Sequence, residues 1–153
     1  MNAPAPVPAD PHFAARIRAS FSRQKAMALI GAALARVEPG YVEIALPFRD
    51  DLTQQKGYVH GGIVGMIADS ACGYAAYTLM PATSSLVTVE YKINLLSPAV
   101  GESLLARGEV IKPGRTLSVT RAEVYARQGG KTVQVAAMQQ TLMMLPDTPD
   151  TQE

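Results

Sequence analysis

One acidic side chain stands out in this sequence because of the residues around it. Asp69 is the only Asp, Glu, Lys or Arg between Gly57 and Val89, and the tripeptide His60-Gly61-Gly62 lies shortly before it. A carboxylate in such apolar surroundings is costly unless it is paired or used, because desolvation disfavours its charged form. An acid used in this way could act as a general base or as a nucleophile, so the segment is a candidate active site.

The two glycines supply the second half of that chemistry. The run from residue 61 to about 79 is too apolar for a surface helix, so we expect a buried helix there. Gly61 and Gly62 would open it, where backbone N–H groups lack intrahelical partners and the helix dipole is positive. Since glycine has no side chain, a carbonyl could approach these N–H groups closely, and they could stabilise a developing oxyanion.

Composition argues against several other classes of function. The chain has 153 residues, one cysteine and a formal net charge of +1. These values fit one domain without an intrachain disulfide in a reducing, cytoplasmic compartment, although a disulfide-free secreted protein would have the same composition. There is no basic stripe with interleaved aromatics, so we expect no nucleic-acid partner. The N-terminus lacks the basic and apolar regions of a secretory signal.

A membrane span is the remaining alternative for the apolar run. Residues 59–80 are long enough to cross a bilayer. However, the segment is rich in Gly, Ala and Ser, and an aspartate at its centre would cost roughly 2.5–3.5 kcal/mol on insertion scales. We therefore expect no membrane partner.

Periodicity and turn residues predict the elements before the buried helix. We expect flexible tails at 1–9 and 146–153 and a single domain at 10–145. Asp10-Pro11 is typical of a helix start, and apolar side chains at four-residue spacing continue that helix to about residue 25. Strand-like stretches at 28–37 and 41–47 indicate a hairpin, and a polar loop then leads to the buried helix.

Four strands are expected after the buried helix, at 86–95, 103–111, 116–127 and 132–145. In the first, alternation places two sets of side chains on opposite faces: Val87, Val89, Tyr91, Ile93 and Leu95 on one, and Thr88, Glu90, Lys92 and Asn94 on the other. Short turns between consecutive strands indicate an antiparallel sheet, which has to wrap a helix that is apolar all round. The sequence therefore predicts an α+β hotdog fold, with five to six antiparallel strands around a long central helix and an extra N-terminal helix.

The segment GYVHGGIVGMIADSACGYAA resembles the HGG-to-acid signature of the PaaI-type hotdog acyl-CoA thioesterases. The later TVEYKINLLSPA and GRT segments are similar to the same family, as is the earlier pattern Phe21, Gln24, Met27 and Ile30-Gly31, so the resemblance covers roughly residues 20–145. It implies hydrolysis of acyl-CoA thioesters with no metal and no organic cofactor, since coenzyme A is part of the substrate. It also implies that the acid comes from a partner subunit, hence a homodimer at least, and a homotetramer as the expected assembly.

The resemblance assigns roles to the candidate residues. Asp69 would be general base on water, or a nucleophile that forms an acyl-aspartyl anhydride. Gly61 would donate its N–H to the oxyanion, and His60 would support that loop. Gln54 would orient the thioester carbonyl or the water, with Gln55 as a competitor for this role.

Three further positions have both a functional and an ordinary interpretation. Thr88 is either a holder of the attacking water or a plain polar strand residue. Gly62 and Arg115 are candidate substrate-binding residues, Arg115 through the phosphates of coenzyme A or else solvated in its turn. Cys72 is expected to be a small buried helix residue rather than a thiol nucleophile.

Two rival functions remain open at this stage. An acyl-CoA sensor or carrier would have the same fold and pocket without a competent acid. A hotdog dehydratase or isomerase would need a histidine acting with an aspartate on a differently spaced motif. The acyl group is also open, with aromatic and medium-chain groups both compatible with the sequence.

Overall fold

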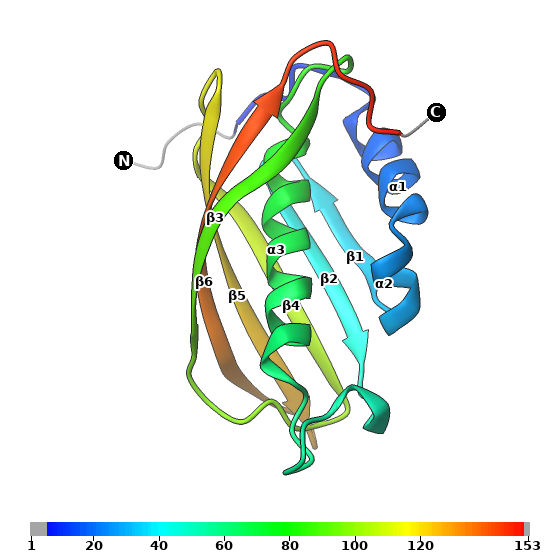
Figure 1. Cartoon of the computed structure of the whole chain (residues 1–153), viewed down its shortest axis with the longest axis vertical. Helices are drawn as coiled ribbons and strands as arrows, with labels where there is room; N and C mark the ends of the chain where they lie inside the picture. The colour runs from blue at the N-terminus through cyan, green and yellow to red at the C-terminus, as the bar shows by residue number, and fades with distance from the viewer. Residues whose placement is uncertain (1–5, 152–153) are drawn as a thin grey trace.

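The computed structural model describes residues 6–151, and its long helix lies in the curve of a six-stranded antiparallel sheet (Figure 1). The strand order is β1-β2-β4-β5-β6-β3, which leaves β1 and β3 at the two edges. This confirms the predicted α+β hotdog fold. The elements are α1 (Phe13–Arg23), α2 (Lys25–Ile30), β1 (Ala33–Glu38), β2 (Tyr41–Pro47), the short 3-10 helix η1 (Asp50–Leu52), α3 (Gly61–Tyr77), β3 (Ser85–Leu95), β4 (Ser103–Lys112), β5 (Leu117–Gln128) and β6 (Lys131–Leu145).

The core lies between α3 and the inner face of the sheet. Small residues of α3 such as Ala68, Ala71 and Ala75 are fully buried, so the helix axis can approach the strands closely. At Gly108 of β4 a Cβ atom would lie 2.3 Å from the backbone carbon of Ala71, so only glycine fits there. Apolar side chains alternate inward along β2, as the sequence predicted for that strand. No helix within residues 6–151 has the length and apolar character to span a membrane.

The N-terminal helices differ from the expectation in two ways. The first helix begins at Phe13 rather than Pro11, and Asp10 instead accepts a hydrogen bond from the His12 amide. Residues 25–30 form the separate helix α2, where a strand-like stretch had been expected from residue 28. Two apolar residues three apart, Met27 and Ile30, are both buried by it, so packing on the core favours one helical turn over an extended chain.

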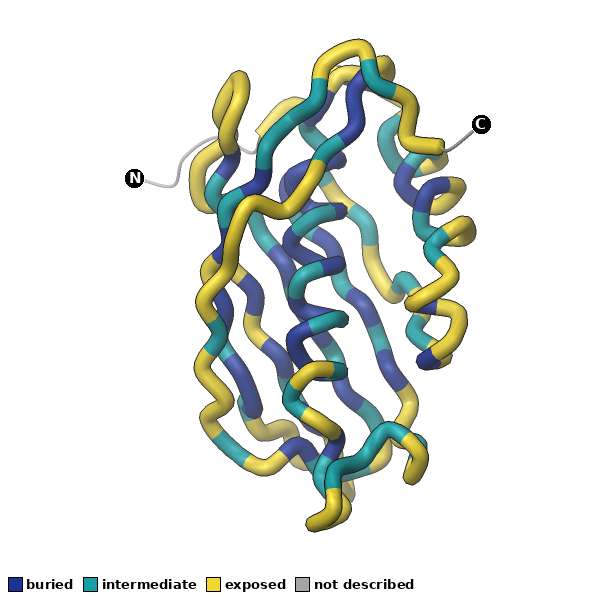
Figure 2. The backbone as a smooth tube through the Cα atoms, in the orientation of Figure 1, coloured by how far each residue is buried: buried dark blue, intermediate teal, exposed yellow. Residues whose placement is uncertain are grey.

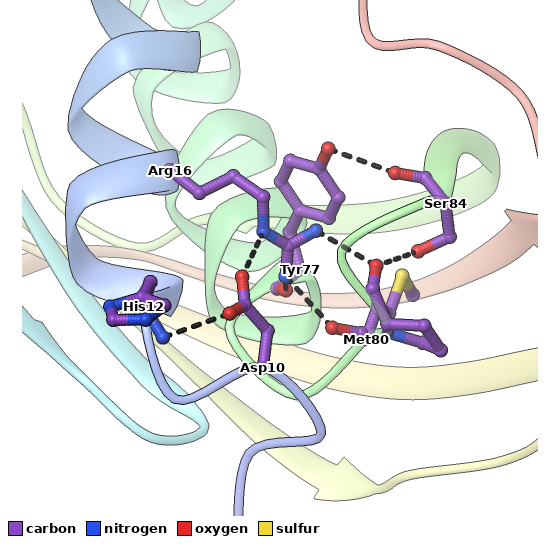
Figure 3. A network of polar contacts seen from close by, with 7 residues as sticks. Asp10, His12, Arg16, Tyr77, Met80 and Ser84 are labelled. Carbon is purple, nitrogen blue, oxygen red and sulfur yellow. Dashed lines mark hydrogen bonds and ion pairs between the residues drawn. The ribbon is translucent and has the colours of Figure 1, made fainter.

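A buried ion pair fastens α1 to the far end of α3 (Figure 3). The Arg16 guanidinium lies 3.0 Å from the Asp10 carboxylate and donates to the carbonyls of Tyr77, Met80 and Pro81. These carbonyls lie at or just beyond the C-terminus of α3, where orphan acceptors and a negative dipole favour a cation. Arg16 therefore fixes the N-terminal helix against the C-terminal end of α3.

Strand β3 is an exposed edge, as the yellow stretch of the tube in Figure 2 shows. Its residues do not alternate as predicted, because a bulge between Thr88 and Glu90 shifts the register against β6. Thr88 consequently faces α3 together with Ile93 and Leu95, whereas the sequence had placed it on the opposite face. The bulge thus turns Thr88 towards the helix and leaves Val87 and Val89, which the sequence had placed on the helix-facing side, exposed at 43% and 53%.

Part of each predicted tail lies outside the described residues, namely 1–5 and 152–153. The mobility of the tails stays a prediction. Within the described part, the Ala9 amide donates to the Leu79 carbonyl, and Asp150 pairs with Arg23 at 2.9 Å.

Candidate active site

The face of α3 that is turned towards β3 is formed by four residues spaced four positions apart. Those residues are Gly61, Gly65, Asp69 and Gly73. On strand β3, Gly61 faces Leu95, and Gly65 faces Ile93 and Tyr91. Asp69 faces Thr88, and Gly73 faces Leu86. Because this face is otherwise made of glycine, the strand can approach the helix until the carboxylate of Asp69 meets the side chains of the sheet.

Asp69 is held by two donors from the sheet, both on the same carboxylate oxygen. Its Oδ1 accepts from the Thr88 hydroxyl at 2.8 Å and from the Gln140 side-chain amide at 2.5 Å. The Gln140 amide also donates to the Thr88 hydroxyl at 2.8 Å. Among residues 6–151, the second carboxylate oxygen, Oδ2, has no hydrogen-bond donor. Asp69 is half-buried, its Oδ1 is hydrogen-bonded to the sheet, and its Oδ2 can still accept a hydrogen bond.

A cavity of about 220 Å³ lies next to this carboxylate. It is bounded by α1, α3, the start of β3 and the C-terminal segment, and its wall combines hydroxyl, amide and aromatic groups. The Ser20 hydroxyl lies 3.3 Å from the Tyr74 hydroxyl, and Ser70 donates to the Gln24 side chain at 3.4 Å. The lining residues are Ser20, Gln24, Asp69, Ser70, Gly73, Tyr74, Tyr77, Leu86, Val87, Thr88 and Asp150.

The N-terminus of α3 is capped by a histidine side chain. His60 caps the helix, because its Nδ1 accepts from the Gly62 amide at 2.9 Å. The amides of Ile63 and Val64 donate to the His60 carbonyl. Within the described chain this leaves the Gly61 amide as the free N–H of the first turn, at the positive end of the helix dipole.

Gln54 lies beside Gly61 in a second cavity of about 350 Å³, between the loop before α3 and the residues that follow β3. The side-chain oxygen of Gln54, Oε1, accepts from the Lys56 backbone amide in its own loop, which fixes the side chain and leaves its NH₂ group for another acceptor. Gln55, the competitor for this role, is exposed and lines neither of the two described cavities.

The predicted site residues therefore fall into two groups within one chain. Asp69 and Thr88 meet at the first cavity, and Gln54 and Gly61 meet at the second. Asp69 lies eight positions after Gly61 on the helix, a rise of about 12 Å at 1.5 Å per residue. A thioester carbonyl bound at Gly61 is therefore out of reach of the acid of the same chain.

Comparison with known proteins identifies the family. The model described as the Thioesterase superfamily matches residues 56–133, which is 78 of the 153 residues and runs from the loop before α3 into β6. The chain belongs to the Thioesterase superfamily. A solved structure of the PaaI protein of E. coli superimposes with a TM-score of 0.80 over 90% of this chain and 96% of that one, in agreement with the predicted PaaI-type hotdog fold. At 19% identity this likeness concerns the fold.

Other members of the superfamily are more similar in sequence. A thioesterase family protein from Silicibacter pomeroyi is 48% identical and has a TM-score of 0.87 over 88% of this chain and 98% of that one. Acyl-coenzyme A thioesterase 13 of Homo sapiens is 27% identical over 101 residues, which are 65% of this chain and 71% of that protein. Two candidate esterases from Saccharolobus solfataricus are 33% and 34% identical over 61% and 63% of this chain, and the matches span 66% and 63% of their own lengths, slightly under two thirds.

Two residues remain outside both groups. Arg115 is exposed in the turn between β4 and β5, the yellow loop of Figure 1, at the opposite end of the molecule from the N-terminus of α3. Cys72 is fully buried, and burial raises the pKa of its thiol to about 12, with the Asp69 carboxylate adding to the shift. It is a packing residue, as expected, because the thiolate that a nucleophile requires is disfavoured there.

Gln140, which contacts both Asp69 and Thr88, was not predicted from the sequence. Gln140 lies on β6 between Met138 and Leu142, two apolar residues that also face inward. A polar side chain at an inward position of an otherwise apolar row is a signal that it has a partner in the core. That signal became visible only once the inward face of β6 was known.

Proposed function

We propose that this protein hydrolyses acyl-CoA or aryl-acyl-CoA thioesters to the free acid and coenzyme A. Membership of the Thioesterase superfamily supports the thioester chemistry, and the name of the human relative supports the coenzyme A group. The observation that carries the proposal is the arrangement of Asp69 beside a cavity: two donors hold one carboxylate oxygen, and no donor from residues 6–151 reaches the other.

In this proposal Asp69 Oδ2 takes a proton from the attacking water. Thr88 already gives its hydroxyl hydrogen to Asp69, so towards water it can only accept. A water that donates one hydrogen to Asp69 Oδ2 and the other to Thr88 has its lone pair free to attack the thioester carbon. Direct attack by Asp69 Oδ2, giving an acyl-aspartyl anhydride, is the second route open to the same oxygen.

The carbonyl oxygen would lie at the Gly61 amide, the free N–H at the N-terminus of α3. The Gln54 NH₂ group is the second donor in reach of that cavity. Removal of one oxyanion donor typically costs roughly 100- to 1,000-fold in rate. His60 contributes by capping the helix, which orients the N-terminal turn, while Gly62 contributes the absence of a side chain.

The two groups of residues would be joined by a second copy of the chain. Strand β3 is a long edge with exposed apolar side chains, among them Val89 at 53% and Tyr91 at 47% exposure. Such an edge invites pairing with another strand. If two β3 strands pair antiparallel about a two-fold axis midway between Thr88 and Leu95, the Asp69 end of one α3 lies beside the Gly61 end of the other. The active site would then be shared, with the acyl group in the cavity beside Asp69.

The proposal is tested by measuring thiol release from a panel of acyl- and aryl-CoA thioesters with the wild type and with Asp69→Asn. We expect turnover of at least one thioester by the wild type and loss of it in the variant. If the wild type binds acyl-CoA at micromolar concentration without turnover, the thioesterase proposal fails and the protein is an acyl-CoA sensor or carrier. Hydration of an enoyl-CoA without thiol release would point to the dehydratase alternative.

A further inference from the structure

Gln140 occupies a position where an amide is unexpected. It is fully buried on the inner face of β6, and its neighbours along the strand on that face, Met138 and Leu142, are apolar. A buried amide without partners costs about 1–3 kcal/mol, so its retention needs a compensating interaction. The compensation here is a pair of hydrogen bonds from the same NH₂ group, one to Asp69 and one to Thr88.

A count of hydrogens shows how completely this cluster is directed at one oxygen. The Gln140 amide has two hydrogens and the Thr88 hydroxyl has one. Two of these three are given to Asp69 Oδ1, and the third goes from Gln140 to the Thr88 oxygen. Every hydrogen is used, so Asp69 Oδ1 is saturated and Thr88 is locked as a donor to the acid.

The other atom of the Gln140 carboxamide gives an independent indication of orientation. Its Oε1 is buried and has no hydrogen-bond donor within residues 6–151. The reverse orientation would place this oxygen 2.5 Å from Asp69 Oδ1 and remove both donated bonds. The amide therefore leaves one of its own atoms unpaired in order to present both hydrogens to the acid and to Thr88.

We propose that Gln140 is a positioning residue that fixes the Asp69 carboxylate through Oδ1 and so selects Oδ2 as the oxygen that reacts. The inference rests on the proposed thioesterase function and adds to it a residue and an atom assignment. Gln140 touches neither water nor thioester in this scheme. Its effect passes through the orientation of Asp69 and Thr88, because a misplacement of about 1 Å can cost roughly 100-fold in rate.

The first test is Gln140→Met, which keeps a similar volume and removes both donors. We expect kcat for thiol release to fall about 10- to 100-fold with little change in KM, because the acyl cavity does not include Gln140. The matched control is Gln139→Met, one residue earlier on β6 with an exposed side chain, which should keep the wild-type kcat. An unchanged kcat in Gln140→Met, or a change confined to KM, overturns the proposal.

The second test is Gln140→Glu, which separates positioning from simple packing. The introduced carboxyl can donate to Asp69 only when it is protonated, so activity relative to wild type should rise at least tenfold from pH 8 to pH 5. The titratable groups around this position are Asp69 and Cys72 of α3 and Tyr91, which is paired with Gln140 on β3. Cys72 and Tyr91 are common to both proteins and cancel in the ratio, whereas Asp69 shares a proton with the introduced carboxyl, so the ratio reports the titration of that pair.

The two variants give separable outcomes. If Gln140→Met does not fold, the pH profile of Gln140→Glu decides, and a flat ratio to wild type overturns the proposal. If the wild type and Gln140→Met release thiol equally while Asp69→Asn is inactive, the proposed function stands and the role of Gln140 falls. If the wild type releases no thiol from any substrate, the proposed function fails first and this inference with it.

Discussion

Replacement of Asp69 by asparagine is the most informative single perturbation of this protein. Asparagine has nearly the same shape, and its carbonyl oxygen can still accept from Thr88 and Gln140 at the present Oδ1 position. The group that replaces Oδ2 is then an NH₂, which donates hydrogen bonds and cannot take a proton from water. The substitution therefore removes the proposed base while keeping the contacts that hold it.

The expected magnitudes follow from those contacts. General-base catalysis contributes roughly 100- to 10,000-fold, so kcat should fall by that factor, equivalent to about 3–5 kcal/mol in the barrier. Stability should change much less. Two charge-assisted bonds become neutral ones, a loss of about 1 kcal/mol each, and this is offset because a half-buried charge no longer has to be desolvated.

The assay is thiol release from an acyl-CoA thioester, with urea unfolding of both proteins as the control for folding. A loss of kcat without a comparable loss of stability agrees with the proposed role. Wild-type turnover by Asp69→Asn would refute it, because no other acid lines the same cavity within the described chain except Asp150, which is paired with Arg23.

Two further predictions concern stability. Arg16→Met should lower the free energy of unfolding by about 3–5 kcal/mol, since it leaves the buried Asp10 carboxylate unpaired and three carbonyls without their donor. The control Arg18→Met, at an exposed position, should have little effect, and equal urea midpoints for the two variants would contradict the prediction. Because burial raises the pKa of the Cys72 thiol from 9.0 to about 12, the unfolded chain loses that proton first, so unfolding free energy should fall as pH rises from about 9 to 12. Urea titrations of wild type and Cys72→Ala should show the shallower decline in the variant, and identical slopes would exclude this origin.

Much of the fold could be predicted from the sequence because its signals are local. Alternating apolar residues marked β2, short turns between consecutive strands marked the antiparallel sheet, and the long apolar run marked a helix with sheet around it. Helix α2 was missed because it contains only two core-facing apolar residues, Met27 and Ile30, too few for the helical period to be distinguished from a strand.

The site was predicted where its residues are close in sequence and missed where the sheet brings them together. His60, Gly61 and Asp69 belong to one helix and its cap, so their spacing indicated their relation. The side-chain direction of Thr88 depends on a bulge that arises from pairing with β6, and Gln140 lies 71 residues from the acid it contacts. Neither follows from local periodicity, because the register of a strand is set by its partner.

Mixed dimers show whether the acid of one chain serves the helix N-terminus of another. Asp69→Asn and Gly61→Val would each be inactive alone; at Gly61 the added side chain meets Leu95, whose exposed end can move aside. If the site is shared, a dimer of one copy of each contains one site with both native residues and one site with neither. Co-expressed in equal amounts, the two variants should recover about one quarter of the wild-type thiol release, because about half of the dimers are mixed. No recovery in purified mixed dimers, or wild-type activity in a strictly monomeric protein, would contradict an active site that is shared between two chains.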